Sequence, residues 1–122
     1  MREQMTDKNQ ILHSEKTLKI IREIERNPQV TQRHLSEKLE ISLGKINYLI
    51  NALIDKGVIE AKNFKNSKKK LAYMYMLTPQ GIKTKIRLTR MFFEWKIQEY
   101  EKLKKEIEDI RKEIPDTEKE YV

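Results

Sequence analysis

Four side chains within one short segment carry groups that can recognise the edges of DNA bases: Lys45, Asn47, Tyr48 and Asn51. Lysine can donate hydrogen bonds to guanine O6 and N7, and asparagine can pair with adenine N6 and N7. A tyrosine can reach a phosphate or pack on a thymine methyl group. The alternative interpretation is that these are ordinary polar residues on the exposed side of a surface helix.

A second group of residues could bind the phosphate backbone. Thr31, Gln32 and Arg33 begin a predicted helix, where free N–H groups and the positive end of the helix dipole favour an anion. Ser42 could act in the same way, although helix capping explains it equally well. Four lysines in a polar segment are further candidates, with a solvated lysine loop as the alternative: Lys65, Lys68, Lys69 and Lys70. Lys83, Lys85, Arg87 and Arg90 could extend the same basic surface.

The positive charge is concentrated in the middle of the chain. The 122 residues contain 26 Lys and Arg against 19 Asp and Glu, a formal net charge of +7. Residues 31–78 contain nine basic and four acidic side chains, so five of the seven excess charges fall there. Such a field favours a polyanionic partner, because binding to phosphates releases condensed counterions. A surface adapted only for solubility is the alternative.

Several function classes lack the residues that they need. The chain has no cysteine, which excludes disulfides, thiolate nucleophiles and cysteine-based zinc sites. His13 and His34 are far apart and have no third ligand near them, so we expect no metal site and interpret both as surface or boundary residues. The sequence also lacks a glycine-rich phosphate loop, an acid pair in an apolar setting and a Ser/His arrangement, so we expect no cofactor and no enzymatic activity. Neither a signal peptide nor a run of membrane-spanning length is present. We therefore expect a soluble cytoplasmic protein, associated with the nucleoid when bound.

Three helices must position the candidate side chains, and apolar spacing predicts them at 8–26, 32–39 and 43–56. The first helix could be capped by Thr6 or Asp7 or by Ser14, and Asn27-Pro28 ends it. Thr31 and Ser42 are the predicted N-caps of the other two helices, and Gly57 supplies the left-handed stop. Two capped helices joined by a turn of three residues are typical of a helix-turn-helix.

A β-hairpin is predicted directly after the third helix. Alternating and β-branched residues predict strands at 58–62 and 71–77, joined by the basic loop 63–70. A helix-turn-helix followed by a basic hairpin is the layout of a winged helix. We therefore predict a mainly α-helical fold with a small β-hairpin wing, whose DNA-binding domain covers residues 8–78.

The remaining chain is predicted as one long helix over 79–114, opened by Thr78-Pro79 and followed by a frayed tail, 115–122. Heptad spacing places apolar residues at the a and d positions, although Thr89 and Lys96 interrupt this stripe. The residues that we expect to form a dimer contact are Phe93, Tyr100, Leu103, Ile107, Ile110 and Ile114. Packing of the stripe against its own domain is the alternative.

Charges beside the stripe favour a parallel pair of helices. Glu99 and Glu106 are at g positions, and Lys104 and Arg111 are at e positions, so a parallel pair brings opposite charges together. Each such ion pair contributes only about 0.2–1 kcal/mol. Aromatic residues at 92, 93, 95 and 100 lie beside this stripe, and a packed dimer core is the favoured interpretation of them.

Three segments, at 27–33, 41–48 and 53–59, resemble the winged-helix core of MarR-type transcriptional regulators. Residues 63–68, 71–73 and 77–81 are similar more narrowly to a small subgroup associated with exopolysaccharide gene clusters. The resemblance implies a homodimer on an inverted-repeat operator, with one recognition helix per half-site and the wings on the flanks. The wing lacks the Asp-Arg pair that many MarR-type proteins carry, and a single C-terminal helix replaces the usual two. The resemblance also implies that the aromatic residues at 92, 93, 95 and 100 could line a pocket for a small effector, as the alternative to a packed dimer core.

Two classes of function follow from these observations. The first is a sequence-specific, dimeric regulator that binds double-stranded DNA through residues 43–56 in the major groove and the wing on the flanking backbone. The second is a winged-helix module for protein–protein interaction that pairs through its C-terminal helix.

Overall fold

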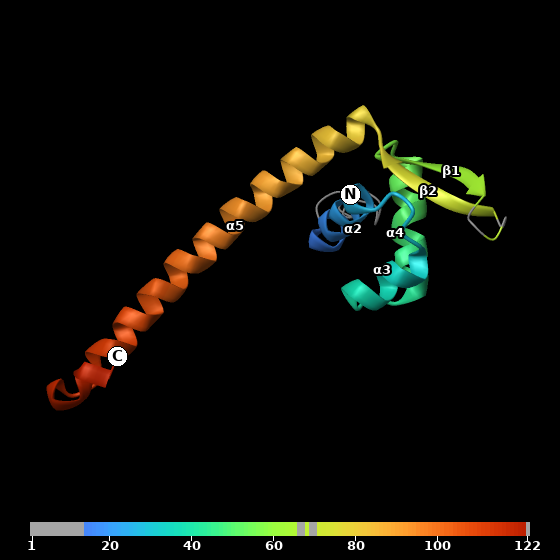
Figure 1. Cartoon of the computed structure of the whole chain (residues 1–122). Helices are drawn as coiled ribbons and strands as arrows, with labels where there is room; N and C mark the ends of the chain where they lie inside the picture. Colours follow the sequence, from blue (N-terminus) through green and yellow to red (C-terminus); the bar gives the residue numbers. More distant parts are fainter. Residues whose placement is uncertain (1–13, 66–67, 69–70, 122) are drawn as a thin grey trace, which may run out of the picture. The chain divides into compact units, whose positions relative to one another are not determined.

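The computed structural model describes residues 14–65, 68 and 71–121, and it has the predicted winged helix-turn-helix fold (Figure 1). The elements in chain order are α2 (Glu15–Arg26), α3 (Gln32–Leu39), α4 (Leu43–Asp55), β1 (Ile59–Lys65), β2 (Leu71–Leu77), α5 (Pro79–Lys112) and the 3-10 helix η2 (Asp116–Tyr121). The mainly helical class, the hairpin wing and the long C-terminal helix are confirmed. The part of the predicted first helix before Ser14 lies outside the described residues.

Helices α2, α3 and α4 all begin with the same kind of hydrogen bond. A side-chain hydroxyl accepts from the backbone N–H three residues later, which satisfies a donor that the helix itself leaves unpaired. These bonds run from Thr17 N to Ser14 Oγ (3.0 Å), from His34 N to Thr31 Oγ1 (3.0 Å) and from Lys45 N to Ser42 Oγ (3.1 Å). The structure therefore selects Ser14 as the cap of α2 and confirms the caps of α3 and α4.

The turn between α3 and α4 is held by its own hydrogen bonds. Glu40 adopts a left-handed conformation (φ 56°), which ends α3. The Ile41 N–H donates to Ser36 O (3.2 Å), and Ser36 Oγ donates to Ile41 O (2.6 Å). The Ile41 side chain is buried. These contacts set the direction in which α4 leaves α3.

Strands β1 and β2 pair antiparallel from Ile59↔Leu77 to Lys65↔Leu71. The prediction that β1 ends at Lys62 was wrong, since Asn63, Phe64 and Lys65 continue the ladder into the segment predicted as loop. The β-propensity of Asn63 and Lys65 is low, but β2 supplies a regular partner strand opposite each of them. The backbone N–H of Tyr75 also donates to Pro28 O (2.8 Å), which ties the hairpin to the turn after α2.

The core lies among α2, α3, α4 and the base of the hairpin. Its fully buried side chains include the apolar stripes that predicted the helices: Ile20, Ile21, Ile24, Leu35, Ile46, Leu49, Ile50 and Leu53. Val30 and Leu35, which lie on either side of the Thr31 cap at the spacing of a hydrophobic staple, are both buried. Val58, Ile59 and Leu88 close the core on the hairpin and α5 sides.

The start of α5 is attached closely to the end of α4. Thr78 caps α5, because its Oγ1 accepts from Gly81 N (2.9 Å), and Thr78 N donates to Val58 O (3.1 Å). An ideal Cβ on Gly81 would lie 2.0 Å from the same Val58 carbonyl oxygen. Glycine is therefore required at this position by a backbone-to-backbone approach.

The first part of α5 presents two different faces. Gly81, Thr84 and Leu88 are buried against the domain, whereas Ile82 and Ile86 are 50% and 55% exposed. At 3.6 residues per turn the two sets lie about 140° apart around the helix axis. The alternative that the heptad stripe packs against its own domain is therefore wrong for Ile82 and Ile86.

The chain divides into two compact units between Thr89 and Arg90. In the second unit α5 continues to Lys112, and its expected dimer residues Phe93, Tyr100, Leu103, Ile107 and Ile110 are exposed. Within the predicted tail, Asp116–Tyr121 form η2. Glu118 N donates to Pro115 O (2.8 Å) at its start, and acidic residues in its first turn suit the positive end of a helix.

No helix of the described part of the chain has the length and apolar character that a membrane crossing needs.

A buried carboxylate joins α2 to α3. Glu23 is 8% exposed, and its two oxygens accept from Lys38 Nζ (2.8 Å) and Arg26 Nη1 (2.9 Å). The hydrogen bond from Lys38 and the two positive charges hold the pKa of Glu23 below its ordinary value, against the opposing effect of burial. Spacing on α2 predicted an apolar stripe but not this ion pair, because Lys38 comes from another helix.

We predict that Glu23→Gln lowers the free energy of unfolding near neutral pH by about 1–2 kcal/mol. The loss is modest because Lys38 and Arg26 are largely exposed and screened by water. Since the folded-state pKa is lowered, the stabilisation is present above the unfolded-state pKa and disappears as the pH falls through the folded-state value. Urea unfolding from neutral to acidic pH should therefore show a flatter pH dependence for this variant. Glu37→Gln, at an exposed position on α3, is the control and should match the wild type.

We predict opposite effects for the same substitution at two helical glycines. Gly81→Ala should destabilise the protein by about 1–3 kcal/mol, because the new methyl group collides with the Val58 carbonyl. Gly44→Ala should stabilise it by about 0.5–1 kcal/mol, because alanine favours the helix and its methyl group would have nothing within 4 Å. Thermal unfolding of both variants compares the two; equal midpoints would contradict the close approach at Gly81.

Candidate nucleic-acid interface

Helix α4 separates its buried and exposed residues cleanly. Ile46, Leu49, Ile50 and Leu53 are buried, and Ser42 caps the helix at its start. The residues predicted to face outward are all exposed, namely Gly44, Lys45, Asn47, Tyr48 and Asn51. The first turns of α4 therefore present a polar surface with one lysine, one tyrosine and two asparagines.

Two of these side chains lie against each other. The Lys45 ammonium is 5.2 Å from the centre of the Tyr48 ring, a cation–π arrangement. Both groups are exposed, so the contact orients the lysine without removing its charge from the surface. The cationic group nearest the start of α4 is thus positioned by its neighbour one turn away.

The two asparagines belong to a hydrogen-bonded chain of four side chains from three elements. Asn51 Nδ2 donates to Asn47 Oδ1 (3.2 Å), and Asn47 Nδ2 donates to Gln32 Oε1 (3.1 Å). Gln32 Nε2 in turn donates to the hydroxyl of Tyr75 (3.2 Å). Gln32 was predicted as a phosphate ligand, and Tyr75 only as a strand residue. The only indication of Tyr75 in the sequence was its position in the alternating pattern that predicted β2.

The polar side chains at the start of α3 are mainly engaged in hydrogen bonds within the protein. Thr31 Oγ1 accepts from His34 N, and the Gln32 side chain bridges Tyr75 and Asn47. Arg33 and His34 are exposed beside them, as expected for surface residues. Ser42 is engaged in the same way as Thr31, so capping accounts for its hydroxyl. Among these candidates, the structure leaves Arg33 as the exposed cation.

The wing presents lysines along β1 and beyond its end. Lys62 and Lys65 are exposed on β1, and Lys68 is exposed in the connection to β2. Lys69 and Lys70 lie outside the described residues. Lysine on an edge strand also discourages pairing with another sheet, so these residues have a structural use as well.

The basic residues at the start of α5 form a less uniform surface than the sequence suggested. Lys85 forms an ion pair with Glu25 on α2, so its charge is partly neutralised. A pocket beside this pair is lined by Arg22, Glu25, Arg26 and Lys85. Lys83, Arg87 and Arg90 are exposed.

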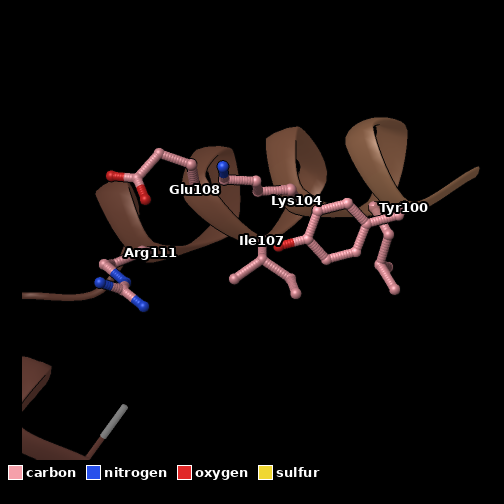
Figure 2. A pocket seen from close by; sticks show the side chains of 6 residues that line it. Tyr100, Lys104, Ile107, Glu108 and Arg111 are labelled. Atoms are coloured by element: carbon pink, nitrogen blue, oxygen red, sulfur yellow. The ribbon is translucent and has the colours of Figure 1, made fainter. Parts of the chain in front are cut away.

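The aromatic residues of α5 do not gather in one place. Phe92 and Trp95 contact each other edge to face, with ring centres 4.9 Å apart. Tyr100 belongs to a pocket further along, where it lies on one side of the helix with Ile107 (Figure 2). Leu103, Lys104, Glu108 and Arg111 complete its lining. In the described residues, no three His, Asp or Glu side chains are grouped so that they could hold a metal ion.

Comparison with known proteins agrees with this geometry. Three solved structures each cover 89% of this chain at 18% identity. A MepR mutant from S. aureus has a TM-score of 0.56, with 88% of its chain covered. A MarR mutant from E. coli in complex with operator DNA has a TM-score of 0.55, with 86% covered. MarR from S. aureus in complex with salicylate and kanamycin has a TM-score of 0.51, with 83% covered.

No curated protein sequence matches the chain. Residues 13–60, however, match the family model of a winged helix-turn-helix DNA-binding domain. This match spans α2, α3, α4 and the start of β1, the elements that carry most of the candidate surface. It describes a DNA-binding domain and not an enzyme, in agreement with the prediction. Together with the fold, it supports a DNA-binding regulator.

Proposed function

We propose that the protein is a sequence-specific transcriptional regulator that binds double-stranded DNA as a dimer. The observation that carries the proposal is the polar, exposed start of α4, with its opposite side buried, in a domain that matches winged helix-turn-helix DNA-binding domains. In the proposed arrangement residues 8–78 bind DNA and residues 79–114 form the dimer contact. The operator is an inverted repeat, with one α4 in each half-site.

Base recognition is assigned to the exposed side of α4. The early residues of a recognition helix come nearest to base edges, and Lys45, Asn47, Tyr48 and Asn51 occupy that part. Gly44 supports close approach, since nothing lies within 4 Å of the position that its Cβ would take. The MarR mutant from E. coli is a structural relative in complex with operator DNA, and we extend that mode of binding to this chain.

Phosphate contacts are assigned to the cations and helix starts that surround α4. Arg33 lies at the start of α3, and Lys65 and Lys68 lie on the wing. The remaining candidates are Thr31, Gln32 and Ser42, through their helix N-termini, and Lys69 and Lys70. The charges of Arg33 and the wing lysines supply affinity that does not depend on the DNA sequence, whereas the residues on α4 supply discrimination between sequences.

Dimerisation is assigned to the a and d positions of α5. Phe93, Tyr100, Leu103, Ile107 and Ile110 are all exposed, and an apolar stripe of this size, although interrupted by Lys96, is unusual on a monomer. Figure 2 shows Tyr100 and Ile107 on one side of the helix, with the charged Arg111 near them. Ile114 completes the stripe. In a parallel pair, Glu106 would face Arg111 of the partner subunit.

The regulated genes are proposed from resemblance alone. The wing and the start of α5 are similar to the subgroup associated with exopolysaccharide gene clusters, through residues 63–81. We therefore propose control of such genes as the first target to examine. Sequencing of the DNA that co-precipitates with the protein from its host cell tests this assignment.

We predict different effects for two substitutions on the DNA-binding surface. Lys68→Ala should weaken binding to all sequences and reduce the slope of log K against log salt by about one unit. Asn47→Ala should cost about 1–3 kcal/mol on the selected site and relax the preference at one base position. Selection of sites from a random duplex pool, followed by titrations at several salt concentrations, measures both effects.

Lys105→Ala is the control, because it removes the same charge from an exposed position of α5. Equal effects of Lys68→Ala and Asn47→Ala on selected and random DNA would contradict the base-reading assignment. If the wild type selects no sequence at moderate salt, the protein is better explained as a module for protein–protein interaction.

We predict that Leu103→Glu weakens dimerisation by at least about tenfold, which corresponds to 1.4 kcal/mol. The charge would lie at a d position and would be desolvated only in the dimer, so the fold of the first unit should be unaffected. Lys105→Glu, at the outward f position, should leave the dimer intact. Sedimentation equilibrium measures both variants, and a wild-type monomer at all concentrations would contradict the dimer.

The orientation of the two helices can be tested separately, because the chain has no cysteine. In Ile110→Cys, a parallel pair in register brings the two thiols together, and mild oxidation should produce a covalent dimer. An antiparallel pair places them far apart and gives no specific cross-link.

A further inference from the structure

We propose that Tyr75 and Gln32 are positioning residues that set the orientation of the Asn47 and Asn51 amides, and through them the sequence preference of α4. This inference rests on the proposed function, since it concerns how α4 reads bases. It assigns a role in recognition to a residue of the hairpin that is itself unable to reach a base, because the Tyr75 side chain is 3% exposed.

The chain of hydrogen bonds is anchored at its buried end. The Tyr75 backbone N–H donates to Pro28 O (2.8 Å), and the Tyr73 ring stacks on the Tyr75 ring with centres 6.2 Å apart. Gln32 is half-buried, whereas Asn47 and Asn51 are exposed. The exposure of the side chains therefore increases along the series of hydrogen bonds from Tyr75 to Asn51. The fixed hydroxyl is at one end, and the groups available to DNA are at the other.

The bonds all run in one direction. Each amide donates through its nitrogen toward Tyr75, and the oxygens of Gln32 and Asn47 accept from the next residue outward. If a single amide were turned over, an oxygen would face an oxygen or an NH₂ group would face an NH₂ group. The amides can therefore reverse only together, with the tyrosine hydroxyl then donating instead of accepting. The orientation of the outermost amide is thus coupled to a group two side chains away.

The direction of the chain has a consequence for base reading. Adenine presents an acceptor, N7, beside a donor, the N6 amino group, in a fixed order. Asn51 uses one N–H within the chain, and its Oδ1 and second N–H stay available to match that edge. An amide that turns over freely matches the edge only part of the time, because its oxygen and nitrogen exchange places. A series held at Tyr75 prevents any one amide from turning over by itself before DNA is bound, which is a form of preorganisation.

Tyr75→Phe tests the inference, because it removes the hydroxyl and keeps the buried ring. We expect affinity for the selected site to fall about three- to tenfold, as for the loss of one hydrogen bond, while affinity for random DNA is unchanged. Tyr73→Phe is the matched control: it lies two residues away on the same strand, is exposed, and is outside the chain of hydrogen bonds. It should bind both DNAs like the wild type.

A double-mutant cycle separates positioning from a general effect on the fold. In an Asn47→Ala background the chain is already broken, so Tyr75→Phe should then have no further effect on the selected site. Thermal unfolding of each variant identifies any loss of stability. Additive effects in the cycle would overturn the inference, as would an equal loss of affinity for selected and random DNA.

The side-chain NH₂ signals of Gln32 and Asn47 in an NMR spectrum of the free protein provide a readout without DNA. Both should shift in Tyr75→Phe and stay in place in Tyr73→Phe; unchanged signals in Tyr75→Phe would overturn the inference. If the wild type selects no sequence, the proposed function itself fails. If it does, and Tyr75→Phe selects as Tyr73→Phe does, only the positioning role fails.

Discussion

Burial of one side of α4 is the constraint on which the candidate interface depends. Ile46, Leu49, Ile50 and Leu53 cannot leave the core without exposing apolar surface, at about 1.5–3 kcal/mol for each side chain. Because a helix has fixed angular spacing, holding this side inward holds Lys45, Asn47 and Asn51 outward. The Ser42 cap and the turn at Ile41 set where the helix begins. The polar surface is thus a consequence of the packing beneath it.

The other elements of the first unit are connected through polar side-chain contacts and through one close approach of two backbone segments. Glu23 joins α2 to α3 through Lys38, and Gln32 joins α3 to α4 and to the hairpin. The Val58 carbonyl accepts from Thr78 and leaves room only for a glycine at position 81. Each contact restricts the orientation of one element relative to another within the first unit. The proposed reading surface therefore also depends on residues that are not assigned to any DNA contact, such as Glu23 and Thr78.

Helix α5 combines two patterns in its first three turns. Gly81, Thr84 and Leu88 face the domain, and Ile82 and Ile86 begin a second apolar stripe on another side. The second stripe continues through Phe93 and Tyr100, which are both exposed. A helix with a single apolar side would need only one partner. With two apolar sides, the proposed dimer contact and the attachment to the winged-helix domain do not compete for the same residues.

Local patterns were sufficient to predict the helices, their caps and the exposed residues of α4. Capping bonds join residues three positions apart, and helix faces follow from a fixed period, so neither needs knowledge of distant residues. The same reasoning failed for the length of β1, since Asn63 and Lys65 are poor strand formers that depend on their partners in β2. It also did not predict η2.

The amino-acid sequence by itself determined the winged helix-turn-helix, because its signals are short-range hydrogen bonds and periodic apolar residues. Only the tertiary structure decided that Gln32 meets Tyr75, 43 positions away, and that Glu23 meets Lys38, 15 positions away. The structure also decided which side of α5 contacts the domain. Contacts of this kind depend on how separate elements pack, and side-chain type and spacing along one element carry no record of that packing.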